Sequence, residues 1–127
     1  MGEVLFTTAE ALEAARRAAG RRYLEFLRVP DLSAGLYVLE AGAADPQTPH
    51  DEDEIYVVMH GRSRFRAGDT AQDVAPGSVL FVPAHLEHRF LDVRERLEVL
   101  VFFGPAEGSR SSDVGAGAAD VPSHELD

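Results

Sequence analysis

Two segments carry most of the information in this chain: GAADPQTPHDEDEIYVVMHG at residues 42–61 and GSVLFVPAHLEHRFLD at residues 77–92. Each combines turn-forming Gly and Pro with a short run of β-branched and aromatic residues, a pattern that predicts β-strands joined by turns. The first segment contains His50 and Glu54, and the second contains His88. Because imidazole and carboxylate groups are common metal ligands, the two segments predict a β-fold and a candidate site together.

The strand pattern continues on both sides of these segments. Runs of β-branched and aromatic residues, separated by turn signals, predict strands near residues 22–29, 33–41, 54–60, 62–67, 70–74, 78–82, 88–92 and 97–103. About eight short strands within roughly 80 residues are typical of an all-β sandwich or small barrel. The middle of the chain is therefore expected to be all-β.

The two ends of the chain differ from its middle. Thr7-Thr8-Ala9-Glu10 fits a capping box with Thr7 as the N-cap, and Gly20 supplies a stop, so one short helix is predicted over residues 8–19. The last residues hold Gly, Ser, Ala and acids without periodicity, which predicts a flexible, disordered tail. The expected organisation is one domain with a helix and lead-in at 1–22, a barrel at 23–103 and a tail at 104–127.

Composition and charge exclude several classes of function. The chain has 127 residues, no cysteine and a net charge of −10. The lack of cysteine excludes disulfides, thiolate catalysis and cysteine-ligated metals, and the negative charge disfavours nucleic-acid binding. The longest stretch without Asp, Glu, Arg or Lys, residues 74–86, is too short to span a membrane, and the N-terminus lacks the pattern of a secretory signal. A cytoplasmic protein that binds no membrane is expected.

The two opening segments resemble the two motifs of the cupin superfamily. The first motif reads G-x5-H-x-H-x3or4-E-x6-G, and Gly42, His50, Glu54 and Gly61 stand at its spacing, with Thr48 where the first histidine belongs. The second motif reads G-x5-P-x-G-x2-H-x3-N. Three of its positions match and two differ: Gly77, Pro83 and His88 agree, while His85 and Asp92 replace the glycine and the asparagine.

The resemblance covers roughly residues 23–103 and implies a fold and an assembly. The implied fold is a double-stranded β-helix, the jelly-roll barrel of the cupins, in which the motif histidines and glutamate point into the barrel mouth. The implied assembly is a homodimer. An N-terminal strand left at the edge of the sheet offers a surface that such association covers.

Independently of the family, three residues form a candidate metal site. His50, Glu54 and His88 make a set of two histidines and one carboxylate, which suits Fe(II), Mn(II), Zn(II), Ni(II) or Cu(II) and leaves coordination positions open. One divalent transition-metal ion is therefore expected, with Fe(II) favoured. The alternative reading is that the histidines are ordinary surface or core residues and that Glu54 is a solvated charge at a strand end.

The missing first histidine leaves the fourth ligand open. Gln47 is the favoured substitute, since its amide oxygen ligates hard or borderline metals and a bulge beside Pro46 or Pro49 turns it inward. Thr48 is a weaker neutral ligand, and water is the third alternative.

Several other residues in or near the motifs are candidates for structural or functional roles. Tyr56, Val58 and Phe90 are expected to point inward with the candidate ligands, as core residues that also form a pocket wall. Tyr56 is also a candidate catalytic residue, whose hydroxyl can hydrogen-bond a ligand or water. His85 is either an exposed turn residue or an acid/base group at the barrel mouth. The acids 51–53 are expected to form a solvated loop.

The favoured functional hypothesis is a metal-dependent, Fe(II)-type oxidoreductase or dioxygenase that acts on a small organic molecule. A metal-dependent isomerase or lyase, with the ion as Lewis acid, is a close variant. The hypothesis from a different class is a non-enzymatic module that binds a metal or a small molecule. The fold alone does not decide among them, because this fold supports many functions.

Overall fold

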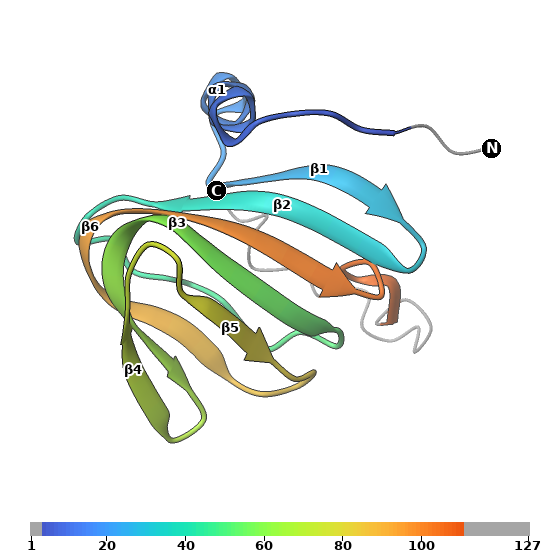
Figure 1. The fold of residues 1–127 in the computed structure, drawn as a ribbon. Helices are drawn as coiled ribbons and strands as arrows, with labels where there is room; N and C mark the ends of the chain where they lie inside the picture. The colour runs from blue at the N-terminus through green and yellow to red at the C-terminus, as the bar shows by residue number, and fades with distance from the viewer. Residues whose placement is uncertain (1–3, 111–127) are drawn as a thin grey trace.

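A computed structural model describes residues 4–110 of the chain and shows one helix followed by six β-strands in this part. The elements are α1 (Ala9–Ala19), β1 (Tyr23–Val29), β2 (Leu32–Leu39), β3 (Asp53–Ala67), β4 (Thr70–Val74), β5 (Val79–Val82) and β6 (His88–Gly104). Figure 1 shows the strands curling around a common interior, with α1 lying outside β1 and β2.

The strands form one antiparallel sheet that folds back on itself. The order is β1-β2-β6-β3-β4, and β5 pairs with the free side of β3. The first half of β3 lies between β5 and the end of β6, whereas its second half lies between β4 and the start of β6. Both long strands therefore pass from one layer into the other, which confirms the predicted double-stranded β-helix.

The structure has six strands where eight were predicted, because two predicted turns, at Gly61 and between residues 92 and 97, are bends inside continuous strands. Gly61 lies inside β3 at a φ of +97°, and the register between β3 and β6 shifts on both sides of it. A Cβ atom at this position would lie 2.3 Å from the carbonyl oxygen of Arg96. The segments predicted as strands 54–60 and 62–67 are thus one bent strand, as are 88–92 and 97–103.

Helix α1 is close to its predicted bounds but begins with a different cap. The Oγ1 atom of Thr8, not of Thr7, accepts a hydrogen bond from the backbone N–H of Ala11 at 3.0 Å. Gly20 ends the helix in the left-handed conformation, as predicted. Leu12 is the buried residue of the helix and packs on the outer face of β2. Within residues 4–110, no helix has the length and apolar character needed to cross a membrane.

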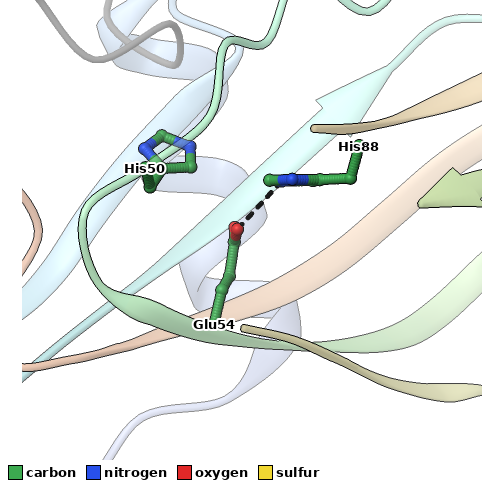
Figure 2. A group of neighbouring side chains, drawn as sticks. All are labelled: His50, Glu54 and His88. Atoms are coloured by element: carbon green, nitrogen blue, oxygen red, sulfur yellow. Dashed lines mark ion pairs between the residues drawn. The ribbon is translucent and has the colours of Figure 1, made fainter. Parts of the chain in front are cut away.

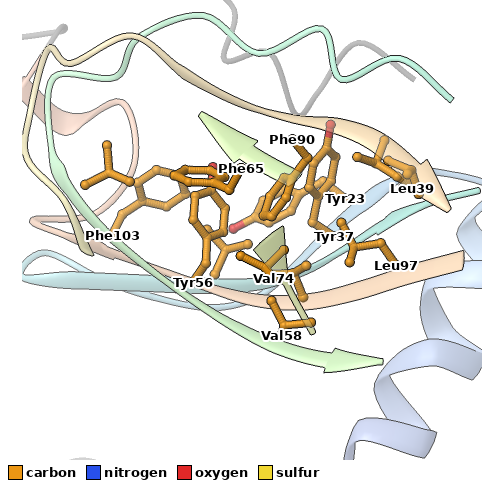
Figure 3. Packing of buried hydrophobic residues seen from close by; sticks show 14 residues of the cluster. Tyr23, Tyr37, Leu39, Tyr56, Val58, Phe65, Val74, Phe90, Leu97 and Phe103 are labelled. Carbon is orange, nitrogen blue, oxygen red and sulfur yellow. The ribbon is translucent and has the colours of Figure 1, made fainter. Parts of the chain in front are cut away.

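The core fills the space between the two layers. Inward-facing residues of all six strands form its main cluster, and aromatic rings occupy much of it, as Figure 3 shows. Tyr56, Phe65 and Phe90 meet edge-on or tilted, with ring centroids 4.9–5.6 Å apart. Tyr56, Val58 and Phe90 are all at most 1% exposed, which confirms the predicted inward wall.

The prediction of a flexible tail beginning at residue 104 is wrong for its first part. β6 continues to Gly104, and residues 105–110 return along the barrel, where Ala106 and Glu107 are buried. The backbone N–H of Ala106 donates to the carbonyl oxygen of Pro30 at 3.2 Å. The rest of the predicted tail, residues 111–127, lies outside the described residues.

Candidate metal centre

Three side chains from separate segments meet inside the barrel. His50 lies in the loop before β3, Glu54 is the second residue of β3, and His88 is the first residue of β6. Figure 2 shows the two rings and the carboxylate pointing toward one another. Each side chain offers one ligand atom, and these atoms lie within 4.8 Å of one another. The structure thus brings together the three residues that the motif spacing selects.

Strand alternation and two loop contacts position these side chains. Glu54, like Tyr56 two residues later, faces inward because alternate residues of β3 point to the same side. The His50 ring packs edge-on against Phe103 of β6, with centroids 4.9 Å apart. The carbonyl oxygen of His50 accepts a hydrogen bond from the backbone N–H of His85 at 2.7 Å. The loop before β3 is therefore tied to the loop before β6.

His88 is held through both ring nitrogens. Nδ1 lies 2.8 Å from the carbonyl oxygen of Leu86, so this nitrogen carries a proton and donates it. Nε2 lies 3.0 Å from Oε1 of Glu54 and 3.1 Å from the hydroxyl of Tyr56. In the metal-free protein, a second proton on Nε2 suits these two oxygens. A metal ion bound at Nε2 would displace that proton.

The pKa values of the buried groups fit this arrangement. Burial lowers the pKa of His88, but the hydrogen bond and charge of Glu54 and the carbonyl of Leu86 raise it by more, so the pKa lies above its ordinary value of 6.5. Burial, together with the charges of Glu54 and Asp45, raises the pKa of Tyr56 well above its ordinary range. The Tyr56 hydroxyl therefore keeps its proton.

Glu54 provides the test of whether a metal ion fits this site. Its side chain is 1% exposed, and its Oε1 atom lies 3.0 Å from Nε2 of His88, a contact that is a hydrogen bond only while that nitrogen carries a proton. A buried carboxylate without hydrogen-bond donors is costly unless a positive charge faces it. His88 supplies that charge when it is protonated, and a divalent ion held by two imidazoles and this carboxylate supplies it otherwise. The donor set fits a divalent transition metal.

Gln47 lies beside the cluster, and Asp45 holds it there. Its amide oxygen accepts a hydrogen bond from the Tyr56 hydroxyl at 2.6 Å, and its amide nitrogen donates to Oδ2 of Asp45 at 2.6 Å. The Asp45 carboxylate also accepts from the Tyr37 hydroxyl and from the backbone N–H of Phe90. Gln47 is thus turned inward, and its role as a metal ligand stays a prediction.

The other two candidates point away from the cluster. Thr48 is exposed. The side chain of His85 is 71% exposed, and its Nδ1 lies 3.3 Å from the Asp51 carboxylate. The φ of His85 is +72°, a conformation that glycine adopts without strain, which is the physical reason for the family's glycine at this position. An acid/base role for His85 stays a prediction, with its ring lying outside the cluster.

Sequence reasoning missed three buried acids: Asp45, which holds Gln47, together with Glu52 and Glu107. Glu52 is 1% exposed, so the expectation of a fully solvated acidic loop is wrong at this residue. Burial raises the pKa of Glu52, while the backbone N–H groups of Gly108 and Arg110 lower it. Glu107 is 4% exposed and places a carboxylate oxygen 3.7 Å from Nδ1 of His50. No periodic pattern marks Glu107 in the sequence, and its proximity to His50 is visible only in the fold.

Comparison with known proteins fits the fold and the site. Residues 35–103 match the family model described as a cupin domain. The chain is a cupin. Cupins commonly bind a metal ion, and both ends of the matched region lie in strands that line the barrel of this cupin.

Three similar proteins illustrate the range of the family. An uncharacterized protein of Streptomyces coelicolor, SCO3923, is 47% identical over 98 residues, which cover 77% of this cupin and 93% of the relative. An RmlC-like cupin of Methanocaldococcus jannaschii has a TM-score of 0.66 at 14% identity, over 91% of this chain and 98% of that one. Oxalate decarboxylase of Bacillus subtilis has a TM-score of 0.56 at 25% identity, over 60% of this chain and 21% of that one.

Proposed function

We propose that this cupin binds one divalent transition-metal ion through His50, Glu54 and His88 and uses it to oxidise a small organic molecule with O2. The observation that carries the proposal is the convergence of these buried side chains on one point. A set of two histidines and one carboxylate is typical of Fe(II) oxygenases. When bound, Fe(II) supplies open coordination positions at which O2 and substrate meet.

The surrounding residues have defined tasks in this proposal. The carbonyl of Leu86 keeps the Nδ1 proton of His88 in place, so that Nε2 is the nitrogen that ligates. The Tyr56 hydroxyl, fixed by Gln47, holds a proton beside the ligands. Phe90 and Phe103, both at most 1% exposed, make the wall apolar and exclude water from the reacting atoms.

The enclosure of the candidate ligands favours a small substrate, because the side chains of His50, Glu54 and His88 are 1–6% exposed. Two hollows of about 300 Å³ and 240 Å³ adjoin the strands that carry Glu54 and His88, but outward-facing side chains such as Arg89 and Phe81 line these hollows, so they lie on the outer face of the barrel. Oxalate decarboxylase, one of the similar structures, is named for a small dicarboxylate.

Metal analysis and mutagenesis test the metal site. We expect about one metal ion per chain in the purified or Fe(II)-loaded protein, and loss of stoichiometric metal in the His50→Ala/His88→Ala double variant. His60→Ala is the matched control, because the His60 side chain is 68% exposed and lies on the outside of the barrel. Circular dichroism verifies that each variant stays folded. Full metal content in the double variant contradicts the proposal.

O2 consumption by the Fe(II)-loaded protein, measured with a panel of small organic acids, sugars and phenols, tests the reaction. Turnover without O2 uptake points instead to the metal-dependent isomerase or lyase. A second candidate is a binding module without turnover. This candidate is favoured by the enclosure of the three metal-binding side chains, which are 1–6% exposed. It predicts that the protein binds a metal ion or a small molecule and catalyses no reaction under any condition.

A further inference from the structure

The carboxylate of Glu107 lies behind His50, on the side of the ring that carries Nδ1. Its Oε2 atom is 3.7 Å from Nδ1, and the side chains of His50 and Glu107 are 6% and 3% exposed. At this distance the contact is electrostatic and longer than a hydrogen bond. Few solvent molecules reach so enclosed a pair, so the negative charge acts on the ring with little screening.

The segment that carries Glu107 is fastened to the barrel by several contacts. The backbone N–H of Glu107 donates to the Ser33 hydroxyl at 2.8 Å, and its carbonyl accepts from the guanidinium of Arg28 at 2.8 Å. The buried carboxylate of Glu52 accepts from the backbone N–H of Arg110 at 3.3 Å. These contacts come from β1, β2 and the loop that also carries His50, so the placement of Glu107 is built into the fold.

We propose that Glu107 is a positioning residue that fixes the ring of His50 for metal binding. A carboxylate beside Nδ1 favours the tautomer with its proton on that nitrogen. Nε2, at the opposite edge of the ring, is then left with the lone pair that ligates a metal ion. Leu86 does the same for His88 through its carbonyl oxygen. Glu107 lies outside the region that matches the family model, so the motifs do not include this partner.

The inference rests on the proposed metal function, and its first test does not use metal. In the 15N-labelled, metal-free protein at alkaline pH, ring-nitrogen chemical shifts report which nitrogen of a neutral histidine carries the proton. We expect the His50 ring of the wild type to be protonated at Nδ1, and the Glu107→Leu variant to shift toward Nε2 protonation. A wild-type His50 protonated at Nε2 overturns the proposal.

Zn2+ affinity, measured by calorimetry, is the second test. Loss of such a histidine partner typically costs about 10- to 100-fold in metal affinity, and we expect a loss in this range for Glu107→Leu. Because the 3.7 Å contact acts through charge, Glu107→Gln, which keeps the size of the side chain but removes its charge, should weaken the affinity in the same direction. Glu95→Leu is the matched control, because it removes the same charge from a side chain that is 60% exposed.

The outcomes separate this inference from the function on which it rests. A wild type that binds no Zn2+ overturns the metal function, and with it this role of Glu107. A wild type that binds Zn2+ together with a folded Glu107→Leu variant of equal affinity overturns the role of Glu107 alone. If Glu107→Leu does not fold, Glu107→Gln and the wild-type tautomer decide. Equal losses in Glu107→Leu and Glu95→Leu indicate a general charge effect and overturn the inference.

Discussion

At the scale of single residues, the site is a set of buried polar groups that satisfy one another. Asp45 and Gln47 point inward while Pro46 and Thr48 are exposed, so this part of the loop is extended and alternates like a strand. Tyr56 links Gln47 to His88 through its hydroxyl. Changes at one of these groups are therefore expected to affect the candidate metal ligands.

Gln47 and Thr48 are the two candidate replacements for the missing motif histidine, and substituting each of them compares the two directly. We expect Gln47→Ala to weaken Zn2+ binding by about tenfold or more, because its oxygen either ligates the metal or fixes Tyr56. Gln47→His should tighten binding, since imidazole is the stronger donor. Thr48→Ala should leave the affinity unchanged, because Thr48 is exposed. An unchanged Gln47→Ala beside a weakened Thr48→Ala contradicts this prediction.

The raised pKa of His88 predicts opposite pH dependences for the metal-free and metal-bound protein. The proton on His88 binds more tightly in the folded than in the unfolded chain, so its stabilising effect is complete below the ordinary pKa of 6.5. That effect is lost as the pH rises through the folded-state pKa. In denaturant unfolding with a chelator present, the free energy of unfolding should therefore fall as the pH rises from 6.5 through the folded-state pKa of His88.

Metal affinity should rise over the same pH range, because ligation by Nε2 displaces the proton. Below the folded-state pKa of His88, the affinity should change by about tenfold per pH unit for one displaced proton. The unfolding experiment has a matched pair of variants. His88→Gln should remove the pH dependence of stability, and the exposed His60→Gln should retain it. The same pH dependence in both variants assigns the effect to another group.

At the scale of elements, the two long strands create the site by bending. β3 carries Glu54 in one layer and Phe65 in the other, and β6 brings His88 opposite the end of β3. The bend in β3 depends on Gly61, whose missing side chain lets Arg96 and Leu97 of β6 approach closely. The position of the ligands relative to one another thus depends on this crossing.

Two glycines with nearly the same backbone conformation isolate the effect of that close approach. Gly61 and Gly77 have φ values of +97° and +95°, but a Cβ atom added at Gly61 would lie within 3 Å of the β6 backbone, whereas one added at Gly77 would meet open space. Gly77→Ala should cost about 1 kcal/mol from backbone strain alone. Gly61→Ala should cost about 3 kcal/mol or more, because it adds overlap with Arg96. Denaturant unfolding measures both, and equal costs contradict the argument.

At the scale of the whole molecule, β1 is an edge strand whose outer face is partly covered by α1. Leu12 of the helix shields Leu36 and Val38 of β2. Elsewhere on the surface, Val79 and Phe81 of β5 are 66% and 63% exposed. An edge strand and exposed apolar side chains are features that association between chains covers.

We expect the full-length chain to form a homodimer, as the cupin motifs predict, and to depend on its N-terminal residues for doing so. Deleting residues 1–22 should weaken dimerisation, because it removes the helix and the exposed apolar side chains of residues 4–6 that association would cover. Light scattering at micromolar concentration measures the mass of both proteins, and circular dichroism verifies that the shortened barrel is folded. A monomeric full-length protein contradicts this prediction.

Local patterns in the sequence were sufficient for most of the strand segments, the helix and the three candidate ligands. Alternation of apolar and polar residues places Glu54, Tyr56 and Val58 on one face, because side chains alternate along any strand. Gly20 ends the helix because the left-handed conformation suits glycine. The spacing of His50, Glu54 and His88 identifies them as a set, since the motifs are read from residue positions alone.

Tertiary structure decided what local patterns leave open. A positive φ at Gly61 serves a turn or a bend equally well, and only pairing with β6 selects the bend. Burial of Glu52 and Glu107 depends on where residues 105–110 pack, and no periodicity encodes that position. His50 and Glu107 are far apart in the sequence, so the contact between them arises only when the chain closes on itself. Removal of a side chain from water is a property of the packed molecule, which is why no signal in the sequence marked Glu107 as a carboxylate near the site.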